Sequence, residues 1–358
     1  MQALETLRGK CLDRLKRFPE AIAAYQSALV VAVGASVSNI TQLMEQAQLH
    51  YRLGWVYVRQ KSVEQGIEHL RKALRIIEKD LPIKDIDENI KNQWRLQQCE
   101  VMTKLASVLL RELPASADEA EILCKKSLKL NPKDQSTHLL LAKIYDKKGQ
   151  LPEAIEAYNS LLKLQSEVKG SPPPKPTLFF SIGCLHEKTK DLKKAVLNYK
   201  KCLTLEPKHF GACIHLANLL ANVGEGQRAA KYFKHAIKVI TESDPTLITK
   251  DGIINAYFGL GKTLQQYSDN KDAPLAPLLK VVQDLDPKHY KAHTQLGILY
   301  LDREEYEKSA EHLKHALLIN RGFPLALVSM GNLLFETGHA EEAIRYHKQA
   351  LTVNEKEL

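Results

Sequence analysis

Residues 290–316 read YKAHTQLGILYLDREEYEKSAEHLKHA, and this stretch decides the fold. Three small residues recur along it: Gly297, then Ser309 twelve positions later, then Ala316 after seven more. The same spacing occurs in four other places, at Gly331, Ala343 and Ala350, at Gly183, Ala195 and Cys202, at Gly54, Gly66 and Ala73, and at Ala217, Ala229 and Ala236. Adjacent copies begin about 34 residues apart, so the chain is built from internal repeats.

We count nine copies, which start near Gln2, Ala47, Cys99, Gln135, Pro176, Phe210, Ile254, Tyr290 and Pro324. One position in the first half of each copy is always glycine or alanine: Gly9, Gly54, Ala106, Ala142, Gly183, Ala217, Gly261, Gly297 and Gly331. Glycine costs about 1 kcal/mol in a helix interior, so its recurrence predicts that a second helix crosses there. The seventh copy departs from the pattern, because Leu275 replaces the small residue of the second helix and the loop 268–272 is longer.

The repeat resembles the tetratricopeptide repeat, whose pattern is W-x2-L-G-x2-Y, A-x3-F, A and P. Besides the small residues, several copies close on proline, at Pro132, Pro207 and Pro287. The resemblance covers nearly the whole chain. It implies an all-α fold, a right-handed superhelical α-solenoid of about nine helix-turn-helix repeats that are stabilised by stacking on their neighbours.

Interruptions of the period predict the domain organisation. Residues 1–168 form a first sub-array of repeats 1–4, with longer junctions at 33–45 and 80–92, and residues 177–358 form a second sub-array of repeats 5–9. Between them lies a spacer, 169–176, with the sequence KGSPPPKP, which cannot continue a helix. Terminal repeats need a polar outer face or a partner, so we expect the array to continue beyond the chain or to be covered by a partner.

The resemblance also implies that the first helices line a concave wall, which in this family holds an extended or helical peptide of a partner. Helical spacing along these helices gives the partner-binding residues Lys143, Phe180, Cys184, Ile214, Asn218, Asn222, Lys291, Thr294, Asn332 and Phe335. Asn218 and Asn332 share one repeat position, but a uniform asparagine ladder is absent. A carboxylate clamp for chaperone tails does not fit either, since Gln295 stands where arginine is needed.

The net charge is +9, and it is concentrated in the middle of the chain. Residues 135–243 carry 17 basic and 9 acidic side chains, a net charge of +8. Lys193, Lys194, Lys200 and Lys201 belong to a second helix and are predicted to face the convex side. They favour an acidic protein partner, whereas nucleic acid is unlikely without interleaved aromatic residues. A merely solvated helix face is the alternative.

No catalytic, cofactor or metal site is expected. Gly261-Lys262-Thr263 imitates the end of a phosphate-binding loop, but the motif requires glycine where Ala256 stands. His312 and His315 lie three residues apart without a third ligand nearby in sequence, and the six cysteines form no paired motif. No apolar run is long enough to insert into a membrane.

These observations predict a non-catalytic scaffold or adaptor that binds partner proteins, as a subunit of a larger complex. The expected location is cytoplasmic, within a cytoskeletal or ciliary assembly. The alternative is a targeting or substrate-recognition module of a larger enzyme, similar to the repeats of glycosyltransferases, or a chaperone-linked co-factor.

Overall fold

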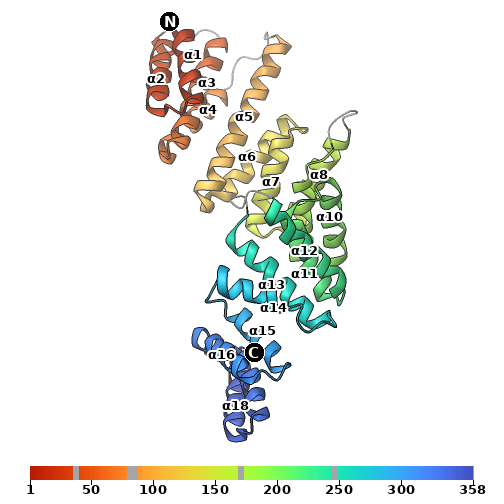
Figure 1. Ribbon diagram of the computed structural model, residues 1–358. Coiled ribbons are helices and arrows are strands. Elements are labelled where there is room, and N and C mark those ends of the chain that lie inside the picture. Colours follow the sequence, from red (N-terminus) through yellow and green to blue (C-terminus); the bar gives the residue numbers. More distant parts are fainter. Residues whose placement is uncertain (35–39, 79–86, 168–172, 243–247, 358) are drawn as a thin grey trace. The chain divides into compact units, whose positions relative to one another are not determined.

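The chain is described by a computed structural model that places residues 1–34, 40–78, 87–167, 173–242 and 248–357 (Figure 1). These residues are helical and contain no strand, which confirms the all-α prediction. They form two compact units, Met1–Pro174 and Lys175–Leu358. Residues 168–172 lie outside the described part, so the spacer 169–176 and the two sub-arrays stay predictions. No helix within the described ranges is long and apolar enough to cross a membrane.

The first unit contains consecutive helix pairs, and each helix packs on its neighbours in sequence. The pairs are α1 (Gln2–Arg14) with α2 (Phe18–Gly34), α3 (Ile40–Arg59) with α4 (Val63–Ile77), α5 (Glu88–Glu112) with α6 (Ala117–Leu130), and α7 (Gln135–Lys148) with α8 (Leu151–Glu167). A short 3-10 turn, η2 (Pro114–Ser116), joins α5 to α6.

The second unit continues the same arrangement. Its pairs are α9 (Pro176–Lys188) with α10 (Leu192–Leu205), α11 (Phe210–Asn222) with α12 (Gly226–Glu242), α13 (Lys250–Tyr267) with α14 (Leu275–Lys280), α15 (Tyr290–Leu301) with α16 (Tyr306–Ile319), and α17 (Pro324–Glu336) with α18 (Ala340–Glu357). In the seventh repeat α14 is short and continues as the π-helix η4 (Val281–Leu285). Both units are therefore stacks of helical hairpins, as an α-solenoid requires.

Most first helices begin at the residue where the sequence repeat begins, but α3, α5 and α13 begin earlier. Parts of the two predicted junctions are therefore helical: α2 runs to Gly34, α3 begins at Ile40 and α5 begins at Glu88. The side chain of Asp87 caps α5 by accepting a hydrogen bond from the backbone N–H of Asn89. Residues 35–39 and 79–86, which also belong to these junctions, lie outside the described part.

In most repeats the small residue of the first helix lies under a large side chain of the second helix, 16 positions later. The third repeat is an exception, because Ile122, which stands 16 positions after Ala106, is exposed. A Cβ atom at Gly297 would lie 2.5 Å from Cγ of Leu313, and one at Gly183 would lie 2.5 Å from Cε1 of Tyr199. Such distances are too short for real contacts, so only glycine permits this approach. The hydroxyl of Ser309 also donates a hydrogen bond to the carbonyl oxygen of Gly297, at 2.8 Å. These contacts confirm the predicted helix crossing.

The same pairing recurs through both units. Leu70 covers Gly54, Tyr25 covers Gly9 and His347 covers Gly331, while the residues 16 positions after Ala142 and Ala217 are the buried Tyr158 and Phe233. The seventh repeat is displaced by one residue, because Leu278 covers Gly261 from 17 positions away. The longer loop before α14 accounts for that extra residue.

The turn between the two helices of a repeat uses one left-handed residue at a fixed position. That residue is Gly149, Gly224 or Gly338 in three repeats and Lys16, Lys61, Lys190 or Glu304 in four others. The next backbone N–H then donates to the carbonyl oxygen five residues before it, as Gln150 does to Tyr145. This bond satisfies the end of the first helix and sets the direction of the second.

Replacing Gly297 with leucine should lower the free energy of unfolding by about 1–3 kcal/mol, because the added atoms overlap the fully buried Leu313. Gly322→Leu is the control, since a Cβ atom there has only Asn320 Oδ1 nearby, at 3.9 Å. Urea unfolding followed by circular dichroism measures both variants. Equal stabilities would contradict the proposed crossing.

Candidate functional site

The first helices of repeats 2 to 4 border an open pocket of about 510 Å³ in the first unit. It contains Lys143, one of the predicted partner-binding residues, together with Tyr51, Thr103 and Lys104. The ammonium group of Lys104 lies 3.2 Å from the centroid of the Trp55 ring, and burial lowers the pKa of this lysine. The pocket thus combines two ammonium groups and hydroxyl groups with an apolar floor.

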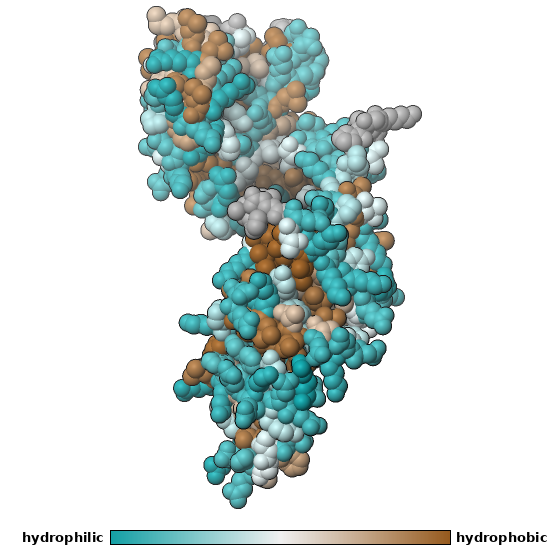
Figure 2. Space-filling view, in the orientation of Figure 1, coloured by the Kyte–Doolittle hydropathy of each residue, from teal (hydrophilic) through white to brown (hydrophobic). Residues whose placement is uncertain are grey.

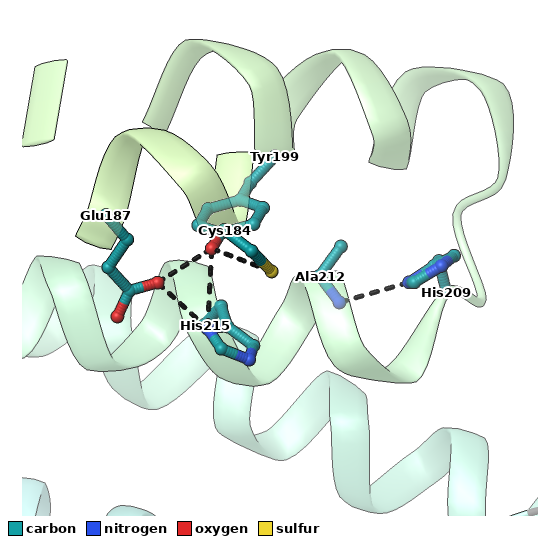
Figure 3. Close-up of polar contacts among 6 residues, drawn as sticks. All are labelled: Cys184, Glu187, Tyr199, His209, Ala212 and His215. Carbon is teal, nitrogen blue, oxygen red and sulfur yellow. Dashed lines mark hydrogen bonds and ion pairs between the residues drawn. The ribbon is translucent and has the colours of Figure 1, made fainter. Parts of the chain in front are cut away.

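In the second unit, first helices α9 and α11 share a polar cluster with the outer helix α10 (Figure 3). We define the Glu187 cluster as Cys184, Glu187, Tyr199 and His215. The hydroxyl of Tyr199 donates to Oε2 of Glu187 at 2.7 Å, and Nδ1 of His215 lies 2.9 Å from the same oxygen. Sγ of Cys184 lies 3.5 Å from the tyrosine hydroxyl. One carboxylate therefore connects two consecutive repeats.

The charge of Glu187 determines which nitrogen of His215 carries a proton toward it. The hydrogen bond from His215, followed by that from Tyr199, lowers the pKa of Glu187 despite its partial burial, so the carboxylate is ionised and accepts hydrogen bonds. Nδ1 of His215 then carries a proton toward Glu187, and Nε2 is the ring nitrogen that remains for another hydrogen bond. Burial raises the pKa of Tyr199, so its hydroxyl stays protonated.

Sequence reasoning named only Cys184 of this cluster. The available signal was the repeat itself: Tyr199 stands 16 positions after Gly183, where the covering side chain belongs, and its phenol is long enough to pass the crossing and reach a carboxylate. Glu187 and His215 lie 28 residues apart on first helices of adjacent repeats. Their contact depends on the relative rotation of those helices, which the repeat pattern alone does not specify.

Phe180 does not have the exposed position that we expected. Its half-buried ring lies 4.8 Å from the ring of His209, 5.5 Å from that of His215 and 5.9 Å from that of Tyr199, measured between centroids. The ring fills space between two repeats and packs close to Gly211, so we expect its removal to lower stability.

Two other inner positions are buried. The hydroxyl of Thr294 donates to the carbonyl oxygen of Tyr290 at 2.9 Å and is inaccessible to solvent, while Ile214 packs in the core of the second unit. Both were expected to be exposed, and that expectation is wrong, because Ile214 packs among apolar side chains of the core and Thr294 is buried with its hydroxyl bonded to its own helix. Cys184 is half-buried.

The remaining inner residues are exposed, and they come from different helices. Lys143 belongs to α7, Asn218 and Asn222 belong to α11, and Lys291 belongs to α15. Asn332 and Phe335 belong to α17, where the phenylalanine side chain is 66% exposed. In the view of Figure 2, apolar surface gathers near α11 and α13. His215, Asn218 and Asn222 form a continuous polar row on α11, because residues three, four and seven apart share a helix face.

The four predicted outer lysines are all exposed on α10. Lys194 forms an ion pair with Asp191 at 2.8 Å, and the ammonium group of Lys201 lies 5.8 Å from the centroid of the Phe179 ring. Lys193 and Lys200 have no carboxylate partner among the described residues.

Two histidine pairs occupy equivalent positions in the second and eighth repeats. Nδ1 of His50 lies 3.0 Å from Nδ1 of His69, and Nδ1 of His293 lies 3.0 Å from Nδ1 of His312. Nε2 of His293 lies 3.1 Å from the carbonyl oxygen of Pro287, so this nitrogen carries the proton and Nδ1 accepts one from His312. The pairs thus hold neutral imidazoles.

His315, which the sequence paired with His312, stacks on His293 with ring centroids 5.4 Å apart. The three rings therefore come together at the junction of α15 and α16. Within the described ranges, no group of three or more histidine, cysteine, aspartate or glutamate side chains is arranged to hold a metal ion.

The histidine pairs should make the fold sensitive to acid. Burial and the paired ring lower the pKa of both His50 and His312 to about 4, whereas an unfolded histidine titrates near 6.5. Between these values the unfolded chain binds more protons, so stability is complete above pH 6.5 and falls as the pH drops toward 4. The loss is at most about 1.4 kcal/mol per pH unit for each histidine.

Urea unfolding at a series of pH values between 7 and 4.5 measures this dependence. His312→Gln should reduce the slope of stability against pH, because the variant lacks one of the groups that cause it. His339→Gln, an exposed position before α18, is the control and should keep the wild-type slope. A wild-type slope in the His312 variant would contradict the assignment.

Comparisons with known proteins agree with this geometry. Family models described as tetratricopeptide repeat match residues 47–80, 116–167, 176–209 and 325–358. The C-terminal part of a TPR repeat-containing protein from Cytophaga hutchinsonii aligns with a TM-score of 0.59, over 81% of this chain and 99% of that one. Sequence identity in that alignment is 15%, so the similarity concerns the fold alone.

Three curated relatives share parts of the sequence. Protein CTR9 homolog from Arabidopsis thaliana is 28% identical over 182 residues, covering 49% of this chain and 15% of that protein. Anaphase-promoting complex subunit CDC16 from Saccharomyces cerevisiae is 25% identical over 218 residues, covering 60% and 24%. BBSome complex member BBS4 from Bos taurus is 23% identical over 237 residues, covering 66% and 42%.

The chain thus spans less than half the length of each of these relatives. Tandem tetratricopeptide repeats account for the helix pairs, the covered small residues and the four matched segments. The chain belongs to the tetratricopeptide repeat family.

Proposed function

We propose that this chain is a non-catalytic scaffold that binds an extended segment of a partner protein along the first helices of its second unit. The observation that carries the proposal is the polar row on α11 that consists of the half-buried His215 and the exposed Asn218 and Asn222. Each asparagine side chain can both donate and accept a hydrogen bond, and Nε2 of His215 provides one more hydrogen-bonding atom. This is the combination that a peptide backbone requires, since its amide groups alternate between donor and acceptor.

The Glu187 cluster supports this proposal by holding His215 in place. Because Glu187 accepts from Nδ1, the imidazole is kept at a fixed orientation that leaves Nε2 for a partner. A preorganised group loses less conformational entropy when a ligand binds. The half-buried Phe180 beside it contributes packing rather than an anchor pocket.

Membership of a larger assembly is the second part of the proposal. Two of the relatives are, by name, members of protein complexes, the anaphase-promoting complex and the BBSome. We infer that this chain also contributes a binding surface to a complex. A cytoplasmic location, in a cytoskeletal or ciliary assembly, stays a prediction.

The alternative, a recognition module within a larger enzyme or a chaperone-linked co-factor, would use the same inner surface. This alternative differs from the scaffold in its associated proteins: the chain would be joined to an enzyme domain or would be isolated together with a chaperone. Affinity purification combined with cross-linking mass spectrometry separates these alternatives, because it identifies both the bound partner and the surface that contacts it.

Replacing both Asn218 and Asn222 with alanine should weaken binding of the main partner by about 1–2 kcal/mol. This corresponds to a dissociation constant that is roughly five- to thirtyfold higher. Both side chains are exposed, so the thermal midpoint should not change. Asn159→Ala on the outer helix α8 is the matched control and should bind like wild type. Binding by isothermal calorimetry, with the purified partner, measures all three. Wild-type affinity in the double variant would refute the inner-wall site.

A further inference from the structure

We propose that the outer helices α10 and α12 bind a second segment of a partner protein, an acidic segment that carries an apolar residue among its carboxylates. This inference rests on the proposed function, since it assumes a scaffold with protein partners, but it uses a different surface. We define the lysine face as Lys193, Leu197 and Lys200 of α10 together with Lys231 and Lys234 of α12.

The repeat spacing places most residues of this face at equivalent positions in two adjacent repeats. Lys200 and Lys234 are 34 residues apart and hold the same position in the fifth and sixth repeats, as do Leu197 and Lys231. Lys193, Leu197 and Lys200 follow one face of α10 because they are four and three residues apart. All five side chains are exposed.

Contacts at one end bring the two helices together. Nε2 of His235 on α12 lies 2.8 Å from the carbonyl oxygen of Pro207, just after α10. The ammonium group of Lys208, in the same turn, pairs with Glu242 of α12 at 3.0 Å. The turn that follows α10 is thus fixed against α12, and from this contact we infer that the exposed lysines of both helices face the same partner.

The lysines of this face differ from those of other outer helices in their ion pairs within the described residues. On other outer helices, lysines pair with an acid one turn away, as Lys72 does with Glu68 and Lys125 with Glu121. Among the described residues, Lys193, Lys200, Lys231 and Lys234 form no such pair. Closely spaced lysines repel each other, and carboxylates of a partner would remove that repulsion.

Leu197 adds an exposed apolar side chain to the lysine face. Its side chain is 53% exposed in the midst of these lysines. An apolar group in a cationic surface matches an acidic peptide with one apolar side chain better than a purely acidic tail, because the apolar contact adds burial to the charge attraction.

Other macromolecules fit this surface less well. Single-stranded nucleic acid is bound where exposed aromatic rings alternate with cations, but the nearby Phe179 and Tyr232 are half-buried. An anionic membrane is bound by helices with a whole apolar face, whereas the exposed leucines of α10, at positions 192, 197 and 205, are interspersed with exposed lysines. Charge complementarity together with Leu197 therefore favours a protein segment.

The eighth repeat does not share this face. In the eighth repeat, the positions equivalent to Lys193 and Leu197 carry Glu307 and Glu311. Lys314 of α16, equivalent to Lys200, is exposed but lies beside these acids in sequence. It offers a control at the same repeat position outside the lysine face.

The test uses the full chain and a fluorescent peptide with several glutamates around one leucine, measured by anisotropy. Lys200→Glu combined with Lys234→Glu should weaken binding about tenfold or more, and added salt should weaken wild-type binding steeply. Lys314→Glu should bind within about twofold of wild type. The Leu197→Ser variant should bind the peptide about threefold to tenfold more weakly than wild type does. This variant should also bind a peptide with serine in place of leucine as well as it binds the original peptide.

Equal binding by wild type and the Lys200/Lys234 variant, or an equal loss in the Lys314 control, would overturn the proposal. Tighter binding of phosphatidylserine vesicles or of single-stranded RNA than of the peptide would also overturn it, since the partner class would be wrong. The Asn218/Asn222 variant should bind the acidic peptide normally. Failure of the inner-wall site and failure of the lysine face are therefore distinguishable.

Discussion

The helix pairs of this chain depend on one close approach, in which a large side chain of the second helix lies over the smallest position of the first. Leu313 over Gly297 and Tyr199 over Gly183 are examples in which a Cβ atom would have no room. The spacing, 16 residues in most repeats, sets the rotation of the second helix, and in seven repeats a left-handed turn residue sets its direction. Since interiors are close-packed, the positions of all other side chains on the hairpin follow from this contact.

The same contact connects the core to the candidate site. Tyr199 covers Gly183 with its ring while its hydroxyl continues to Glu187, which in turn holds His215 of the next repeat. A residue needed for packing thus also orients a polar group at the surface. Phe180 shows the opposite outcome: an inner position that looked available for a ligand is filled by rings from the neighbouring repeat.

Outer positions are under no such constraint. A side chain at Lys200 or Lys234 lies in solvent and covers no small residue, so its charge can change without affecting the crossing. The fifth and sixth repeats place lysines there, whereas the eighth places glutamates at the neighbouring positions 307 and 311. The common fold therefore supports different surfaces on different repeats, and this freedom is what a scaffold with several partners needs.

The sequence by itself determined the helical hairpins, their crossing residues and the irregular seventh repeat, because small residues at fixed spacing have one physical use in a helix pair. It also identified the exposed Asn218, Asn222 and the outer lysines, since helix periodicity separates faces. Tertiary structure alone decided that Ile214 and Thr294 are buried, that Phe180 is packed, and that Glu187 meets His215. Those outcomes depend on the rotation and distance between adjacent repeats, which arise from the packing of side chains distant in sequence and leave no periodic signal in the chain.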